Sequence, residues 1–230
     1  MSLLTPRLRV AIVGYGTAGQ ASAILLARQG HEVTIFEDVL PGDLGPVGAG
    51  VGLQPIGLSV LARLGGDAFS ACMSHGKRIE GILGTTHPAD ARWPKRPVLD
   101  LRYSDLGEHG LFGVGMHRGA LWQALANEVE GPALAPNIEL KAGVRIAKLS
   151  PPRAPPAGDL WETSCNEAMD ALRGQQATRR LLDGAGAQHG DFDLVVAADG
   201  RASTLRPQVR LVVLFSFFYL QCSYCKLTHD

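Results

Sequence analysis

The sequence has no excess of charge of either sign, since 22 Lys and Arg residues balance 22 Asp and Glu residues. No basic field therefore points to nucleic acid or to an anionic membrane surface as a partner. Cysteine is scarce as well, and four cysteines in 230 residues do not form a disulfide framework. The N-terminus shows no apolar segment separate from the first expected strand, so we predict no signal peptide and a cytoplasmic protein.

A long hydrophobic run is also missing. The most apolar stretch, 211–220, has ten residues, whereas a membrane-spanning helix needs about 20. We therefore predict no transmembrane span, and a buried strand, a membrane-surface segment or an aggregation-prone end remain as alternatives for this stretch. The pair Cys222-x-x-Cys225, followed by His229, has no second Cys pair, so free thiols are expected and no bound metal. No spacing resembles a hydrolase triad.

The first fifty residues carry the strongest pattern. An apolar run at 8–13 leads directly into the glycine motif G-Y-G-T-A-G at 14–19, and a helix-like segment follows. A second strand-like run, E-V-T-I-F-E, ends at Glu37. This order predicts a βαβ unit that binds a dinucleotide, and hence an α/β fold with a Rossmann-like FAD/NAD(P)-binding domain. The residues expected around the pyrophosphate are Gly14, Gly16, Thr17, Ala18 and Gly19.

The glycines and the acid of this unit each have a mechanical reason. Gly14 permits the tight turn out of the strand, Gly16 lets the backbone approach a pyrophosphate, and Gly19 lets the helix pack close to the sheet. Glu37, 18 residues after Gly19, can accept hydrogen bonds from an adenosine ribose. Because its charge would repel a 2′-phosphate, we expect this site to take FAD or NAD rather than NADP.

The middle of the chain combines two expected helices with short strands. Pro55 suits the first turn of a helix that ends near Gly65. The predicted core face of this helix comprises Ile56, Val60, Leu61 and Leu64. Strand-like runs at 76–84, 98–103 and 111–116 alternate with turn residues, which favours an antiparallel sheet. A further helix is expected from His117 to about Val129, and a strand from 138 to 149.

Towards its C-terminus the chain becomes less regular. The stretch 150–191 opens with a proline-rich, linker-like segment and has no strong period, whereas 192–200 predicts a buried parallel strand. Asp199, at the end of this strand, is either a turn residue that holds the strand exit or a binding residue. Arg118 opposes the helix dipole at the start of its helix, so it either meets a cofactor phosphate or is a solvated surface residue.

Four motifs in this order resemble those of a known family. They are G-Y-G-T-A-G with Glu37, G-A-G-V-G-L-Q-P at 48–55, H-R-G-A-L at 117–121 and D-L-V-V-A-A-D-G at 193–200. Over residues 8–206 they are similar to the N-terminal part of an FAD-dependent aromatic-ring monooxygenase of the p-hydroxybenzoate hydroxylase-like class. The resemblance implies FAD as cofactor, NADH or NADPH as hydride donor, and hydroxylation of a small aromatic or related organic substrate with O2.

The same resemblance implies roles for individual residues. Arg118 would reach the cofactor, and Asp199 with Gly200 would match the D-G motif associated with flavin and pyridine nucleotide. Ile146 would stand where the strand backbone passes the adenine. Because the flavin performs the oxygen chemistry while the protein orients the substrate and excludes water, no catalytic side chain is named. Neither the substrate nor the oligomeric state follows from these motifs.

One motif of the family is missing. No second G-D motif follows Arg206, and the segment 207–230 matches nothing in the family. We therefore expect a truncated or frame-shifted chain that is incomplete and inactive as a hydroxylase. A non-catalytic dinucleotide-binding remnant and an NAD-dependent oxidoreductase stay open as alternatives.

These assignments predict how the chain is divided. Residues 1–75 and 117–206 form a discontinuous FAD/NAD(P)-binding domain. Residues 76–116 form a partial antiparallel β layer on the substrate side, and 207–230 form an atypical apolar tail.

Overall fold

A computed structural model describes residues 7–40, 43, 48–86, 96–106, 110–150 and 179–208. The chain divides into two compact units. The first unit consists of the described residues up to Leu44 and from Val129 onward, and the second unit contains Gly45–Glu128. These limits differ from the predicted domain limits, because 45–75 and 117–128 fall in the second unit. The functional division into a cofactor domain and a substrate layer stays a prediction.

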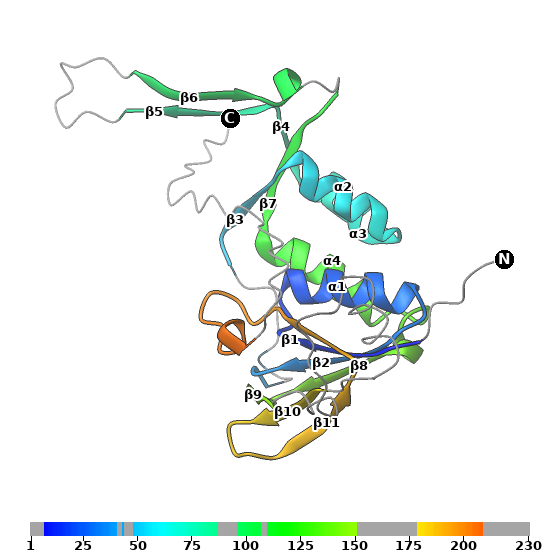
Figure 1. The fold of residues 1–230 in the computed structure, drawn as a ribbon. Helices are drawn as coiled ribbons and strands as arrows, with labels where there is room; N and C mark the ends of the chain where they lie inside the picture. Colours follow the sequence, from blue (N-terminus) through cyan, green and yellow to red (C-terminus); the bar gives the residue numbers. More distant parts are fainter. Residues whose placement is uncertain are drawn as a thin grey trace, which may run out of the picture. The chain divides into compact units, whose positions relative to one another are not determined.

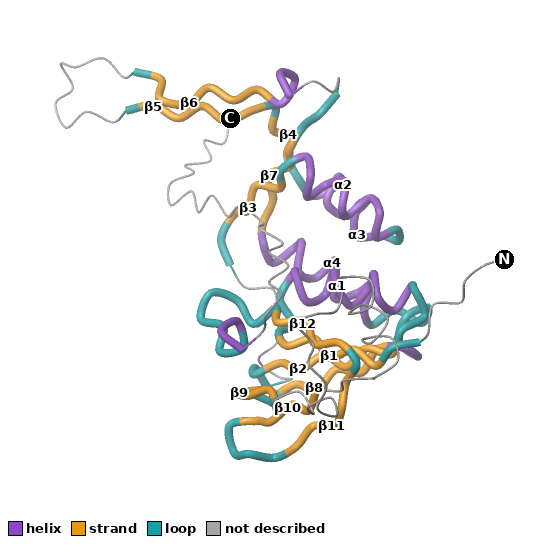
Figure 2. The backbone as a smooth tube through the Cα atoms, viewed as in Figure 1, coloured by secondary structure: helices purple, strands orange, loops and turns teal. Residues whose placement is uncertain are grey.

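The first unit contains a parallel sheet of four strands in the order β12-β1-β2-β8 (Figure 2). Its strands are β1 (Arg9–Val13), β2 (Glu32–Glu37), β8 (Ile138–Ala142) and β12 (Leu194–Ala197). Ile12 of β1 pairs with Ile35 of β2 on one side and with Val196 of β12 on the other. Because β1 has a neighbour on both sides, its residues from Val10 onward are almost fully buried.

The helix α1 (Thr17–Arg28) connects β1 to β2 and completes the predicted βαβ unit (Figure 1). Its buried hydrophobic residues are Ala21, Ala23, Ile24 and Ala27. These mostly small side chains let the helix pack closely on β1 and β2. The approach is tightest at Gly19, where a Cβ atom would collide with the carbonyl oxygen of Gly14 and lie 3.4 Å from Ile12 Cγ2. The predicted reason for Gly19 is therefore visible in the packing.

Replacing Gly19 with alanine should destabilise the first unit. Alanine favours a helix more than glycine does, but the added methyl group has no room, and we expect a net loss of about 1–3 kcal/mol. Denaturant unfolding measures this loss. Gly184→Ala is the matched control, because a Cβ atom at that exposed position meets nothing within 4 Å. Equal unfolding free energies for the two variants would contradict the close packing of α1.

A second sheet of the first unit is antiparallel, with the order β11-β10-β9. Its strands are β9 (Ile146–Leu149), β10 (Arg179–Asp183) and β11 (Gln188–Phe192). The buried cluster between the two sheets comprises Ala11, Val13, Phe36, Ile146, Leu181, Phe192 and Leu205. The rings of Phe36 and Phe192 meet edge to face, with centroids 5.8 Å apart. This cluster fixes the end of β2 against the second sheet.

Three predictions for the C-terminal part of this unit need correction. The single strand expected over 138–149 is two strands in different sheets, because Gly143 takes a positive φ of 77° between them. The stretch expected to be irregular contains β10 and β11, while its proline-rich part, 151–178, lies outside the described residues. The strand expected to be buried, β12, is partly exposed because it stands at the edge of the parallel sheet.

The described residues of the second unit form three α-helices and two small antiparallel sheets. The helices are α2 (Pro55–Leu64), α3 (Asp67–His75) and α4 (Arg118–Val129). One sheet has the order β3-β7-β4, with β3 (Gly50–Leu53), β7 (Gly113–His117) and β4 (Lys77–Ile79). The other pairs β5 (Gly81–Thr85) with β6 (Pro97–Arg102). The antiparallel pairing predicted for this region and the helix predicted from 117 to 129 are confirmed.

The core face predicted for α2 is partly wrong. Leu61 and Leu64 are buried, but Ile56 is 76% exposed and Val60 is only half-buried. The buried residues of the helix are Gly57, Leu58, Leu61 and Leu64. The observed stripe shares Leu61 and Leu64 with the predicted one, and it contains Gly57 and Leu58 in place of Ile56 and Val60. Pro55 does stand in the first turn, as predicted.

The apolar run, the Cys222-x-x-Cys225 pair and His229 all lie outside the described residues. Among the helices that are described, none is both long and apolar enough to cross a membrane.

Candidate functional site

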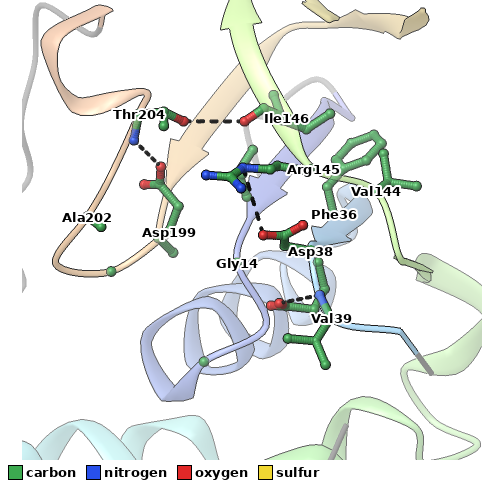
Figure 3. A pocket seen from close by; sticks show the side chains of 15 residues that line it. Gly14, Phe36, Asp38, Val39, Val144, Arg145, Ile146, Asp199, Ala202 and Thr204 are labelled. Atoms are coloured by element: carbon green, nitrogen blue, oxygen red, sulfur yellow. Dashed lines mark hydrogen bonds and ion pairs between the residues drawn. The ribbon is translucent and has the colours of Figure 1, made fainter. Parts of the chain in front are cut away.

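A pocket of about 360 Å³ opens at the carboxyl ends of β1, β2 and β12, within the first unit (Figure 3). It is lined by Val13, Gly14, Gly16, Phe36, Glu37, Asp38, Val39, Val144, Arg145, Ile146, Ala198, Asp199, Gly200, Ala202 and Thr204. Ligands of open parallel sheets bind at this edge of the strands. The volume lies in the range usual for small-molecule sites.

The glycine turn between β1 and α1 forms one wall of the pocket. Gly14 takes a φ of 108°, its N–H donates to the Phe36 carbonyl at 2.7 Å, and a Cβ atom there would collide with the Ala198 carbonyl. A Cβ atom at Gly16, by contrast, would meet nothing within 4 Å. The turn is thus packed tightly at Gly14, while at Gly16 the backbone is left open towards the pocket.

The N-terminus of α1 follows this opening. Gly16 is the N-cap residue, and as a glycine it has no side chain with which to cap the helix. The first turn contains no acidic residue that would neutralise the positive end of the helix dipole. A helix start of this kind attracts an anion such as a phosphate. Thr17, Ala18 and Gly19, although predicted as site residues, belong to this turn and do not line the pocket.

Glu37 lies at the end of β2, as predicted, and its carboxylate links two segments of the site. One oxygen accepts the Tyr15 N–H at 2.6 Å, and the other accepts the Val39 N–H at 3.0 Å. A carboxylate has about four acceptor positions, so each oxygen can still accept another donor. The side chain therefore fixes the glycine turn and also presents free acceptor capacity to the pocket.

Asp199 has the turn role that the sequence left open. Its Oδ2 accepts the Thr204 N–H at 2.9 Å and the Leu205 N–H at 3.4 Å, which closes the turn after β12 (Figure 3). Its Oδ1 is buried and has no hydrogen-bond partner among the described residues. Gly200 follows with a φ of 79°. Both residues line the pocket, so the turn role does not remove them from the site.

Ile146 and Arg118, the remaining predicted site residues, have different positions. Ile146 is buried, lines the pocket, and accepts a hydrogen bond from Thr204 Oγ1 at 3.3 Å. Arg118 belongs to the second unit, where its N–H donates to the Ala49 carbonyl at 2.9 Å. A Cβ atom at Gly48 would lie 3.0 Å from its Cδ. The cofactor contact of Arg118 stays a prediction.

Nine lining residues were not predicted as site residues: Val13, Phe36, Asp38, Val39, Val144, Arg145, Ala198, Ala202 and Thr204. Five of them stand within two residues of Gly14, Glu37 or Asp199, so their position beside the site was a signal in the sequence: Val13, Phe36, Asp38, Val39 and Ala198. The other four become neighbours of these residues only through the turns after β8 and β12. Pairing of β8 with β2 could not be read from the chain order, since the two strands are far apart in sequence.

Burial, together with the nearby Glu130 carboxylate, raises the pKa of Tyr15, whose hydroxyl donates to Glu130 at 3.3 Å. The phenol of Tyr15 is therefore neutral, and only its backbone serves the site. Within the described ranges, no three His, Cys, Asp or Glu side chains could hold a metal ion together.

Comparisons with known proteins agree with this geometry. No protein-family model matches the chain. The chain is 30% identical over 203 residues to 3-amino-4-hydroxybenzoate 2-monooxygenase from Streptomyces cremeus, a match that covers 88% of this chain and 42% of the relative. It is 29% identical over 213 residues to kynurenine 3-monooxygenase from Salinispora arenicola (strain CNS-205), covering 89% and 38%. The chain is thus similar to monooxygenases, among them one from Aspergillus ustus that is named flavin-dependent.

The chain spans about two fifths of the length of the Streptomyces and Salinispora relatives. Solved structures share its fold. The tetrameric form of 2-methyl-3-hydroxypyridine-5-carboxylic acid oxygenase has a TM-score of 0.58 at 23% identity, covering 90% of this chain and 43% of that one. A variant of HpxO from Klebsiella pneumoniae, complexed with FAD, has a TM-score of 0.55 at 17% identity, covering 88% and 42%. The predicted family resemblance and α/β class with a parallel sheet are confirmed.

Proposed function

We propose that the first unit is the Rossmann-like part of a flavin-dependent monooxygenase and that its pocket binds the adenosine diphosphate half of FAD. The observation that carries this proposal is the combination at the glycine turn. Gly16 leaves open space in front of an uncapped helix N-terminus, and Glu37 presents acceptor capacity beside it. A phosphate anion would fit in front of the helix N-terminus, and a hydroxyl of the neighbouring sugar would donate a hydrogen bond to Glu37.

The residues present fit the cofactor one by one. Gly14, Gly16 and the first turn of α1, with Thr17, Ala18 and Gly19, would surround the pyrophosphate, and Glu37 would accept hydrogen bonds from the ribose. Ile146 would lie at the adenine. Asp199 and Gly200 would line the path of the cofactor. The contact of Arg118 with the cofactor is proposed on the family resemblance of its motif alone. The negative charge of Glu37 disfavours a 2′-phosphate, so NADP is not expected here.

When bound, FAD would supply the oxygen transfer to a small aromatic or related organic substrate, with NADH or NADPH as hydride donor and O2 as co-substrate. The described residues contribute binding and orientation. The helix N-terminus holds negative charge, and the Glu37 carboxylate fixes both the turn and the sugar through charge-assisted hydrogen bonds. We assign no catalytic side chain in this part of the chain.

A second candidate is an NAD-dependent oxidoreductase or a non-catalytic dinucleotide-binding protein. The pocket is equally compatible with FAD and with NAD, because the two cofactors share the adenosine half. The relative that is named flavin-dependent and the structural neighbour that is complexed with FAD favour FAD.

A reconstitution experiment separates these functions. Purified protein is mixed with FAD, supplied with NADH or NADPH and a panel of phenolic and other aromatic acids, and assayed for hydroxylated product and hydrogen peroxide. Oxidation of the nicotinamide that depends on FAD supports the flavin function. Retention of NAD together with failure to retain FAD would support the alternative.

A further inference from the structure

Two turns form one rim of the pocket. The turn after β2 contains Asp38 and Val39, and the turn after β8 contains Val144 and Arg145. Two backbone hydrogen bonds join them: the Val144 N–H donates to the Glu37 carbonyl at 2.8 Å, and the Gly143 N–H donates to the Val39 carbonyl at 3.0 Å. The positive φ of Gly143 allows this pairing. The rim is thus a defined structure rather than two independent loops.

An ion pair closes the rim. Arg145 Nε lies 3.8 Å from Asp38 Oδ2, and the side chains are 68% and 61% exposed (Figure 3). An exposed pair at this distance contributes little to stability. Arg145 is the one cationic residue among those that line the described pocket, which also holds three carboxylates, Glu37, Asp38 and Asp199.

The charges and the apolar side chains that line the pocket with Arg145 determine which part of a nucleotide its guanidinium can contact. With three carboxylates nearby, a second phosphate group at this rim is disfavoured. Val39 and Val144, which line the same pocket as Arg145, instead offer apolar surface. A planar, uncharged base fits such a surface, and a guanidinium stacks on an aromatic face more readily than an ammonium does.

We propose that Arg145 positions the adenine ring and helps to select it over other bases. The guanidinium stacks on the face of the ring, and the Asp38 carboxylate orients the guanidinium. This inference rests on the proposed binding of the adenosine half of FAD. Arg145 lies outside the glycine motif, and its proposed role is to make the site selective for adenine.

The test measures dissociation constants of ADP and UDP by calorimetry for the full chain and for Arg145→Ala, Arg145→Lys and Asp38→Asn. Arg145→Ala should weaken ADP binding about three- to tenfold and should lower the preference for ADP over UDP. Arg145→Lys should restore only part of the affinity, because the charge remains but the planar group is lost. Asp38→Asn should have a smaller effect in the same direction.

Arg102→Ala serves as the matched control. Arg102 is 69% exposed and pairs with Asp100 at 3.7 Å on β6, in the other unit. This variant should bind ADP as the unchanged chain does, and all variants should keep the same melting temperature. Unchanged ADP affinity in Arg145→Ala would overturn the role of Arg145 while the proposed function stands, and so would full rescue by lysine. If the unchanged chain binds neither ADP nor FAD, the proposed function and this inference both fail.

Discussion

Replacing Gly16 with valine should lower the affinity for FAD and for ADP at least about 100-fold, the equivalent of about 2.7 kcal/mol, without unfolding the protein. In the structure a Cβ atom at Gly16 meets nothing within 4 Å, so the new side chain collides with no protein atom near its base. The backbone at Gly16, with φ −74° and ψ 177°, is also one that β-branched residues adopt readily. The added atoms would instead fill the space in front of the helix N-terminus, where the pyrophosphate would lie.

Binding and stability must therefore be measured on the same samples. Calorimetric titration gives the affinity, and thermal unfolding without ligand gives the melting temperature. Gly16→Ala should have a smaller effect on binding in the same direction. Gly184→Ala, whose added Cβ is equally unobstructed but lies away from the pocket, should change neither quantity. Wild-type affinity in Gly16→Val would show that no ligand passes this turn.

Replacing Glu37 with alanine should weaken FAD binding by about 1.5–3 kcal/mol, or roughly tenfold to 150-fold, the range for hydrogen bonds to a charged group. The loss has two sources. The ribose would lose its acceptor, and the N–H groups of Tyr15 and Val39 would lose theirs, which loosens the glycine turn. We therefore expect a lower melting temperature in addition to weaker binding, in contrast to Gly16→Val.

Glu37→Gln should have an intermediate effect on both sources. The amide keeps one acceptor oxygen but offers an NH₂ group to the second N–H, so stability and affinity should both fall between the wild-type and alanine values. Asp191→Ala, which removes an exposed acid paired with Arg180 away from the pocket, controls for the change of net charge. A Glu37→Ala variant that binds FAD and NAD with unchanged affinity would refute the assignment of Glu37 to the ribose.

The first βαβ unit could be predicted from the sequence because its constraints are local. Gly14, Gly19 and Glu37 act within about thirty residues, through a turn, a close helix contact and a strand end. The structure confirms the position of each of them. The antiparallel pairing in the second unit was predictable for the same reason, since runs and turns alternate along the chain.

The other side of the pocket could not be predicted, because it depends on contacts between distant segments. Gly143 separates β8 from β9, and only the pairing of β8 with β2 brings Arg145 beside Asp38. A periodic pattern shows neither the break nor the partner strand. Asp199 was ambiguous because both a turn residue and a binding residue follow a strand in the same way, and only the hydrogen bond from the Thr204 N–H reveals the turn role.

The central claim, that the pocket binds the adenosine diphosphate half of FAD, is tested most directly by competition. FAD is bound to the purified full chain, ADP, NAD or FMN is added in turn, and the FAD that stays with the protein after desalting is quantified by chromatography. We predict that ADP displaces FAD in a single-site manner and that FMN, which lacks the adenosine half, does not. Displacement by FMN with no effect of ADP would contradict the account, because recognition would then depend on the flavin and not on this pocket.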